Sequence, residues 1–464
     1  MDLLLIHPGV KSDVISEHLG LASLKAFLTQ YGFKVDILDM ALENLDIPAV
    51  IQKMQQMQPG AIGISILDQT KEQGLSLIQQ IKQAGFSRPL IAGGYFPTFH
   101  ADELLKNVPD IDFIVRGEGE YTLLDLMHSL SGRGNRPLTG ISGISYHLNG
   151  QLRHNPPRPL IYDLDSLPMV DRKYAGWLIK KTGHLRVYAS RGCWGNCSFC
   201  DINSFYTSSP GKKWRSRSIA KFADELEYLA RTYRCDYFIL NDDNFLTRGL
   251  HNRQRAENLA AELARRNLSV RFEMMCRVDS IDRQALVYLK RSGLQRVFLG
   301  IESFDQNQLD RFGKGTTVRQ NLKALITLKR LKIDCIVSVI LADAYTRLRD
   351  LIKQYFVLFM VQKKYFTSKN CKISINERLE LYRGSLSYRQ YKQAGLLTSD
   401  HWYDGYDFRL KKMTAGRLKL ARLENKIYRK IAGWKKNFAN RSPGKPAAGL
   451  RNDFSSQLLK ISKN

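Results

Sequence analysis

The chain lacks the long hydrophobic runs that a membrane-spanning protein needs. Its longest apolar runs are short and flanked by charge, and none approaches the roughly 18 uninterrupted apolar residues of a transmembrane helix. The first ten residues also lack the basic region and the small-residue cleavage site of a signal peptide, and they predict a β-strand instead. We therefore expect a cytoplasmic protein with no membrane span.

Cysteine is scarce as well. The 7 cysteines of this 464-residue chain are too few and too unevenly placed for a disulfide framework. Three of them lie in one short segment, and they are Cys193, Cys197 and Cys200. The other four are scattered, and we expect them to behave as small buried apolar side chains: Cys235, Cys276, Cys335 and Cys371.

Acidic residues are too few to balance the basic ones, and the formal net charge is +27. The excess avoids residues 1–150, which carry 11 basic and 16 acidic side chains, and residues 341–464 alone contribute +18. Much of it lies between Lys411 and Lys436, where the pattern predicts a basic amphipathic helix. A solvated helix face is the simplest interpretation, and an anionic substrate or peripheral membrane contact is the alternative. Because no RNA-binding module is recognisable, we expect no nucleic-acid partner.

Residues 1–145 alternate strand-like apolar runs with helical periodicity. This alternation predicts a parallel, doubly wound, Rossmann-like sheet. Such sheets bind ligands beyond the carboxyl ends of their strands. Ser65, Leu67 and the pair Gly93–Gly94 stand at such ends. The glycines would let the backbone approach a ligand closely, although they could also serve simple turns.

A segment rich in Asn, Pro and Arg predicts a linker over residues 146–175. Alternation then resumes, with strands expected at 186–190, 237–242, 270–275, 296–301 and 335–340. This pattern predicts a complete or partial TIM-type (β/α) barrel over residues 176–390, with its chemistry at the carboxyl ends of the strands. Residues 391–464 would form a basic helical extension.

The three clustered cysteines form a CxxxCxxC motif directly after the first predicted barrel strand. A zinc site would need four ligands, and no fourth cysteine or histidine follows at an ordinary spacing. Three thiolates on one short loop suit a 4Fe–4S cluster better. Such a cluster normally takes four cysteines, so a three-cysteine loop leaves one iron open to a substrate or cofactor.

With an aromatic residue before its last cysteine, this motif resembles the signature of the radical S-adenosylmethionine (SAM) enzymes. Similar supporting motifs follow the later strands, at residues 241–245, 277–279, 300–303 and 314–317. The resemblance implies that SAM binds the open iron and is cleaved to methionine and a 5′-deoxyadenosyl radical. It also implies that the backbone of Phe199 lies near the adenine and that Asp243, Arg277 and Glu302 contact SAM. Each of these three could equally be a loop cap or an ion pair at the barrel mouth.

The spacing Ser65-x-Leu67, followed 25 residues later by Gly93-Gly94, resembles the second half of the cobalamin-binding signature. The first half, Asp-x-His-x-x-Gly, is absent. Near its place stand His18 and Gly20, with one residue between them where the signature has two. We therefore expect no histidine ligand on cobalt. Together the two domains resemble the cobalamin-dependent radical SAM enzymes, which include magnesium-protoporphyrin cyclases and many C- and P-methylases.

This resemblance implies three cofactors, namely a 4Fe–4S cluster, SAM and cobalamin, together with an electron donor such as flavodoxin or ferredoxin. It favours a methyltransferase acting on an unactivated carbon or phosphorus of a small natural-product or lipid precursor. Such a carbon offers no nucleophile, so the hard step is delegated to cofactors. The alternatives are a non-methylating radical cyclase or oxidoreductase, more remotely an RNA-modifying enzyme, and a non-catalytic cobalamin sensor, which the intact cysteine motif disfavours.

Overall fold

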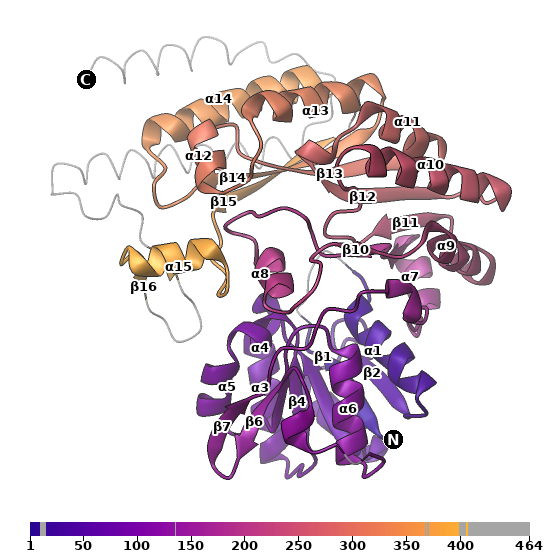
Figure 1. The fold of residues 1–464 in the computed structure, drawn as a ribbon, viewed down its shortest axis with the longest axis vertical. Helices are drawn as coiled ribbons and strands as arrows, with labels where there is room; N and C mark the ends of the chain where they lie inside the picture. The colour runs from indigo at the N-terminus through magenta and orange to yellow at the C-terminus, as the bar shows by residue number, and fades with distance from the viewer. Residues whose placement is uncertain (10–14, 135, 367, 369–370, 399–404, 407–464) are drawn as a thin grey trace.

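The computed structural model describes residues 1–9, 15–134, 136–366, 368, 371–398 and 405–406. The segment between Lys411 and Lys436, where a basic helix is expected, lies outside these residues. Two sheets, one from each half of the chain, lie one above the other along the long axis of the molecule (Figure 1). Within the described residues, none of the helices combines the length and the apolar character needed to cross a membrane.

The N-terminal sheet has seven strands in the order β2-β1-β3-β4-β5-β6-β7. Its first five strands are parallel, as the alternating sequence pattern predicts. The strands are β1 (Leu3–His7), β2 (Val35–Asp39), β3 (Ala61–Ser65), β4 (Leu90–Gly93), β5 (Phe113–Val115), β6 (Ile144–Leu148) and β7 (Gln151–His154). Successive side chains of β1 enter opposite cores, Leu3 and Leu5 on one face and Leu4 and Ile6 on the other.

Helices cover both faces of this sheet and confirm a doubly wound domain. They are α1 (Leu19–Gln30), α2 (Ile47–Met57), α3 (Lys71–Gln83), α4 (Tyr95–Phe99), α5 (Ala101–Asn107) and α6 (Glu120–Leu130). Side chains cap the first turns of α1 and α2. His18 accepts a hydrogen bond from the backbone N–H of Leu21, and Asp46 accepts one from that of Ala49.

The N-terminal domain extends farther than the sequence pattern indicates. Strands β6 and β7 form an antiparallel hairpin that continues the sheet, so residues 146–154 belong to it and not to a linker. Ile161, Leu164 and Val170 then pack into the same core. The segment expected to be a linker is therefore largely part of the first domain.

The second sheet has six parallel strands in the order β15-β14-β13-β12-β11-β8. The strands are β8 (Leu185–Val187), β11 (Tyr237–Leu240), β12 (Arg271–Arg277), β13 (Leu294–Glu302), β14 (Asp334–Ala342) and β15 (Lys372–Arg378). The five expected strands are present, and β15 adds a sixth. Because β8 and β15 are both edges of this sheet, the barrel is partial.

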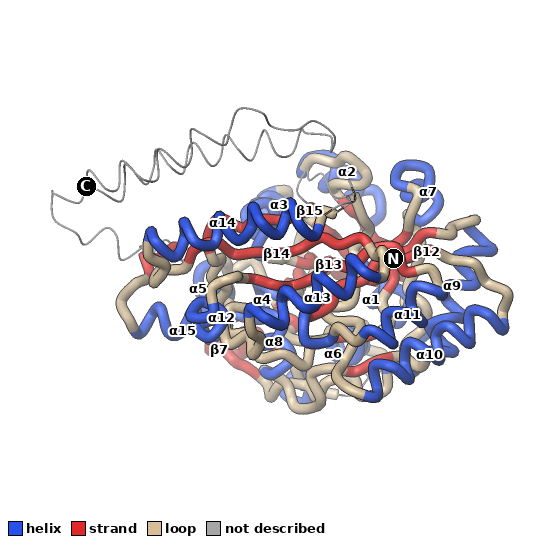
Figure 2. The backbone as a smooth tube through the Cα atoms, turned by 90° about the horizontal axis from the view of Figure 1, so that it is seen from above, coloured by secondary structure: helices blue, strands red, loops and turns tan. Residues whose placement is uncertain are grey.

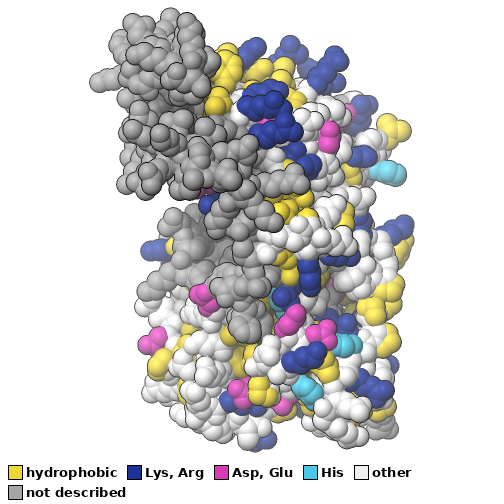
Figure 3. All heavy atoms as spheres, turned by 90° about the vertical axis from the view of Figure 1, so that its left-hand side faces the viewer, with side chains coloured by type: hydrophobic (Ala, Val, Ile, Leu, Met, Phe, Trp, Pro, Cys, Tyr) yellow, Lys and Arg dark blue, Asp and Glu magenta, His cyan; other side chains and the backbone are white. Residues whose placement is uncertain are grey.

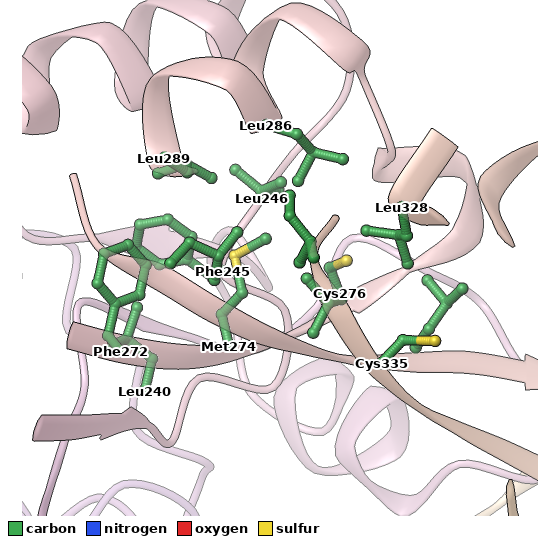
Figure 4. Packing of buried hydrophobic residues seen from close by; sticks show 14 of the residues in the cluster. Leu240, Phe245, Leu246, Phe272, Met274, Cys276, Leu286, Leu289, Leu328 and Cys335 are labelled. Atoms are coloured by element: carbon green, nitrogen blue, oxygen red, sulfur yellow. The ribbon is translucent and has the colours of Figure 1, made fainter. Parts of the chain in front are cut away.

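Helices flank the outside of this sheet, as the view from above shows (Figure 2). They are α7 (Ala175–Thr182), α9 (Ile219–Tyr233), α10 (Leu250–Arg265), α11 (Arg283–Arg291), α13 (Val318–Arg330) and α14 (Leu348–Tyr365). Met274 and Cys276 of β12 pack in one apolar layer with Leu286 and Leu289 of α11 (Figure 4). This layer fixes the strands whose carboxyl ends carry the site.

The four scattered cysteines divide between core and boundary positions. Cys235, Cys276 and Cys335 are buried as expected, whereas Cys371 is half-buried.

The charge asymmetry of the sequence is also visible, because Lys and Arg side chains gather on the upper half of one face, which holds the second sheet (Figure 3).

Buried ion pairs join the two domains. Arg172 lies between Glu17 of the first domain and Glu225 of α9, with 2.7 Å from its Nη2 to Glu225 Oε1. Arg191, directly before the cysteine motif, reaches Glu120 of α6 at 2.6 Å. Removing one partner of a buried pair leaves an uncompensated charge, which costs roughly 3–5 kcal/mol. These pairs therefore hold the carboxyl ends of the two sheets in a defined relation.

Candidate functional site

The three motif cysteines lie on the loop between β9 (Ser190–Arg191) and α8 (Asp201–Thr207). Cys197 is buried, and Cys193 and Cys200 are half-buried. Burial raises the pKa of the Cys193 and Cys200 thiols, so a positively charged group must compensate if they are to bind as thiolates. Among the described residues, no three His, Cys, Asp or Glu side chains converge as the ligands of a single metal ion do.

Two aspartates after β11 hold the start of this loop. Asp243 accepts a hydrogen bond from the backbone N–H of Gly192 at 2.9 Å, and buried Asp242 accepts bonds from Ala189 N–H and the Ser190 hydroxyl. Gly192 has φ +78°, and a Cβ there would lie 1.9 Å from the Lys213 carbonyl oxygen, so only glycine fits. Asp243, the expected SAM contact, thus acts here as a cap of the cysteine loop, and Asp242 is a second cap that sequence reasoning missed.

The end of the same loop is held from the opposite side. The backbone N–H of Ser198 donates to the Phe312 carbonyl at 2.8 Å, and the Ser198 carbonyl accepts from the Ser387 N–H at 2.8 Å. The ring of Phe199 packs edge-on against Phe312, with 5.1 Å between ring centroids. The ring of Phe199 is therefore held by Phe312, and the contact of its backbone with the adenine stays a prediction.

Arg277, at the end of β12, connects the cysteine loop to the barrel mouth. Its Nη1 lies 3.0 Å from Cys197 Sγ, its Nε donates to Asp279 at 2.9 Å, and its Nη2 donates to the Lys314 carbonyl. Its guanidinium also lies over the ring of Trp194, 4.5 Å from the centroid. The neighbouring Cys197 and Asp279 raise the pKa of Arg277, so it places a permanent positive charge beside a motif thiol.

Glu302 ends β13 in the left-handed region, with φ +66°. Its Oε1 accepts from Lys314 Nζ at 3.0 Å, and both residues are buried. A Cβ on Gly300 would lie 2.6 Å from Glu302 Oε1, so a side chain there would displace the Glu302 carboxylate. The structure therefore brings Arg277 and Glu302 together around Lys314. Lys314 lies in the motif at residues 314–317, but the sequence alone gave it no role.

The chemistry of these residues fits an iron-sulfur cluster with a bound SAM. Three thiols share one loop, and a cube binds each thiolate at a different iron, so they need not converge on one point. Within the described part of the chain, the hydroxyl of buried Thr316, beside Lys314, has no hydrogen-bond partner. An unsatisfied buried polar atom calls for a ligand or water. The cysteines would hold the cluster, and Arg277, Glu302 and Thr316 are the candidates for contacts with SAM.

The expected cobalamin residues lie at the carboxyl ends of β3 and β4. Gly94 has φ +100°, and a Cβ there would lie 2.7 Å from the Ile66 carbonyl oxygen. A Cβ on Gly93, in contrast, would meet only the Val115 carbonyl oxygen and Cβ, at ordinary distances of 3.6 and 3.9 Å. The backbone N–H of Leu67 is bound by Thr70 at 3.0 Å. Two consecutive glycines at the end of β4, beside the end of β3, thus leave bare backbone at this edge of the sheet, a cradle that fits a large ligand.

Both ring nitrogens of His18 are occupied within the protein. Nδ1 accepts from the Leu21 N–H at 3.1 Å, and Nε2 lies 3.1 Å from Ser65 Oγ. Burial lowers the pKa of His18 to about 3, so the imidazole is neutral. The ring of His7 packs edge-on against it, with centroids 4.8 Å apart, and His7 Nδ1 pairs with Asp39 at 3.0 Å. His18 is therefore part of the sheet end, and the absence of a histidine ligand on cobalt stays a prediction.

We expect electron paramagnetic resonance of the protein-bound cob(II)alamin state to show no nitrogen splitting from a protein imidazole. The physical reason is that both ring nitrogens of His18 are already hydrogen-bonded within the protein. His18→Gln should leave the spectrum unchanged and alter only the stability of the β1–β3 end. An imidazole splitting that disappears in His7→Ala would show instead that His7 is the ligand.

The cradle and the cysteine loop meet at an aromatic contact. Tyr95, directly after Gly94, stacks on Phe205 of α8, with ring centroids 4.2 Å apart and planes at 22°. Figure 1 shows α4 and α8 side by side where the two domains meet. Burial raises the pKa of Tyr95, and Tyr206 and Asp243 add to that rise. The stacking on Phe205 places Tyr95 beside both halves of the site. Its place directly after the glycine pair was the signal that could have found it.

Comparison with known proteins agrees with this geometry. Residues 9–127 match the B12 binding domain, and residues 187–346 match the radical SAM superfamily. The chain is a cobalamin-dependent radical SAM enzyme. An uncharacterized methyltransferase of Pyrococcus horikoshii is 29% identical over 350 residues, 74% of each chain. The anaerobic magnesium-protoporphyrin IX monomethyl ester cyclase of Rubrivivax gelatinosus is 30% identical over 345 residues, 71% of this chain and 60% of that protein.

Solved structures of this family share the fold. The cobalamin-dependent SAM radical enzyme OxsB, with aqua-cobalamin and SAM bound, matches with a TM-score of 0.74 and 20% identity over 100% of this chain and 75% of its own. The methyltransferase TsrM of Kitasatospora setae matches with a TM-score of 0.72 and 18% identity, over 87% of this chain and 79% of its own. The cofactors of this enzyme class are therefore cobalamin, SAM and a 4Fe–4S cluster.

We expect Arg277→Lys to slow SAM cleavage roughly tenfold to a hundredfold, because a charged hydrogen bond contributes about 1.5–3 kcal/mol. Lysine keeps the charge but loses the fork that joins Cys197, Asp279 and the Lys314 carbonyl. The rate of 5′-deoxyadenosine formation at equal iron content measures the effect. The matched control is Arg253→Lys, whose pair with Asp282 is exposed. Equal rates for both variants would contradict this role.

Proposed function

We propose that this enzyme transfers a methyl group from SAM to an unactivated carbon or phosphorus of a small natural-product or lipid precursor. The observation that carries the proposal is the contact of Tyr95 with Phe205. It sets the glycine cradle of the first domain against the helix that begins directly after Cys200. A methyl donor in the cradle and a radical source on the cysteine loop would then address one substrate atom.

When bound, the cluster and SAM supply a 5′-deoxyadenosyl radical, and cobalamin supplies the methyl group. The chain itself positions the cysteine loop and the two domains. Asp242 and Asp243 cap the start of the cysteine loop, and Ser198 fixes its end. The buried pairs of Arg172 and Arg191 keep the two domains in register. Holding reactants in place is the main advantage that such a site adds to cofactor chemistry.

We also propose a protein electron donor of the flavodoxin or ferredoxin type. Each SAM cleavage needs one electron delivered to the cluster. Cys193 and Cys200 are only half-buried, which supports delivery from a docked donor and not from a deeply buried relay.

The methyltransferase relatives support the main proposal, and the cyclase relatives keep a non-methylating radical reaction as the second candidate. SAM labelled with deuterium in its methyl group distinguishes them when it is incubated with candidate substrates, reductant and the reconstituted enzyme. We expect a product that carries the labelled methyl group. A product formed with no label would favour cyclisation or oxidation.

A further inference from the structure

A pair of thiols lies at the opposite end of the second sheet from the cysteine loop. Cys335 is the second residue of β14, and Cys371 directly precedes β15. The neighbouring register pair is Ile336 with Lys372, so the two cysteines stand opposite each other on adjacent parallel strands. Their sulfur atoms are 3.9 Å apart. The mechanism uses neither residue.

The surroundings of the two sulfurs differ. Cys335 is buried in the apolar layer that also contains Leu328 of α13 (Figure 4), whereas Cys371 is half-buried and reachable from solvent. The backbone N–H of Cys335 donates to Cys371 Sγ at 3.3 Å. Hydrogen bonds from Cys335 lower the pKa of Cys371, because they favour its charged form. Cys371 is thus the attacking thiol of the pair and Cys335 the resolving one.

The backbone can accommodate a bond between them. Neighbouring strands lie about 4.8 Å apart, and disulfides join Cα atoms about 4.4–6.8 Å apart. To form the bond, the two sulfurs must approach from 3.9 Å to about 2.05 Å. The other two scattered cysteines offer no such pair, since Cys235 Sγ contacts the Tyr237 carbonyl and Cys276 stands opposite Leu299 of β13.

We propose that Cys335 and Cys371 form an oxidisable dithiol that closes to a disulfide when the protein meets a disulfide oxidant such as oxidised glutathione. The Cys371 thiolate attacks a sulfur of the oxidant and releases one glutathione thiolate. Cys335 then attacks the mixed disulfide and releases the second. The two protein thiols lose two electrons and two protons in total, and oxidised glutathione gains them as two thiols.

The bond would affect the site through β15. This strand leads to Ser385 and Ser387, and the Ser387 N–H and hydroxyl both contact Ser198 of the cysteine loop. The disulfide would covalently link the start of β15 to β14, the strand with which it already pairs. Disulfides in reducing compartments are usually transient and catalytic or redox-sensing, which is the behaviour proposed here.

The test uses the full-length, reconstituted protein under anaerobic conditions, treated with defined ratios of oxidised to reduced glutathione. Free thiols are then trapped with N-ethylmaleimide in denaturant, and peptides are mapped without reduction. We expect a linked peptide pair containing Cys335 and Cys371, in more than half of the chains at the most oxidising ratio, that dithiothreitol reverses. Cys235 and Cys276 should be recovered as alkylated thiols, and Cys371→Ser should leave Cys335 alkylated.

Recovery of both Cys335 and Cys371 as alkylated thiols at every ratio would overturn the proposal. So would a stable glutathione adduct on Cys371 with Cys335 unmodified, because the resolving step would then be absent. The mapping of the unsubstituted protein decides the question even if a variant fails to fold. It is also independent of the proposed methyl transfer, since it measures a bond and not turnover.

Discussion

Replacement of any one motif cysteine by alanine should abolish SAM cleavage. We expect reconstituted protein to contain about four irons per chain, and Cys193→Ala, Cys197→Ala and Cys200→Ala each to lose most of that iron. Each thiolate binds a different iron of the cube, so no neighbour can replace it. Iron analysis and 5′-deoxyadenosine formation with a strong reductant measure the two effects.

The matched control is Cys235→Ala, which removes a buried thiol of the same domain far from the motif in sequence. It should keep its iron and its SAM cleavage, with only a modest loss of stability. A triple variant of the motif cysteines that still formed 5′-deoxyadenosine would contradict the cluster assignment. Stoichiometric zinc in the purified protein would do so as well.

Substitution of the glycine pair should remove cobalamin binding for two separable reasons. Gly94→Ala places a side chain at φ +100° and 2.7 Å from a carbonyl oxygen, so the strand end itself must shift. Gly93→Val is the more informative change, because the protein leaves room for its Cβ. We expect it to weaken cobalamin binding roughly tenfold or more, because the ligand must pass against bare backbone there.

Two measurements separate these effects, namely the equilibrium binding of cobalamin and the free energy of unfolding. Gly94→Ala should lower both, whereas Gly93→Val should lower binding with little change in stability. Gly176→Ala serves as the control, because its Cβ would enter open space on α7. Unchanged cobalamin binding in Gly93→Val would show that the cradle lies elsewhere.

The fold was largely predictable because its strands are short apolar runs bounded by turns. Both faces of β1, β3 and β4 are buried, and parallel strands buried on both faces leave this pattern in a sequence. The β6–β7 hairpin was missed although Asn149-Gly150 carries its signal. These residues have φ +51° and +76°, the conformation that an Asn-Gly hairpin turn requires.

The site was predictable where its residues are close in sequence, and less so where they meet only in space. The cysteine spacing and the glycine pair can be recognised in the sequence directly. The contacts of Arg277 with Cys197 and of Ser387 with Ser198 span 80 and 189 residues, and no local pattern records them. Asp243 shows the same limit, because its motif marks it as important while only the structure shows that it holds the Gly192 N–H.

We propose that a methyl donor and a radical source act on one substrate atom. The ratio of the two SAM-derived products tests this claim most directly. With a substrate in hand, we expect one S-adenosylhomocysteine and one 5′-deoxyadenosine for each product molecule, and a product heavier by one methyl group. Formation of 5′-deoxyadenosine without stoichiometric S-adenosylhomocysteine, and with no gain of a methyl group, would contradict the account.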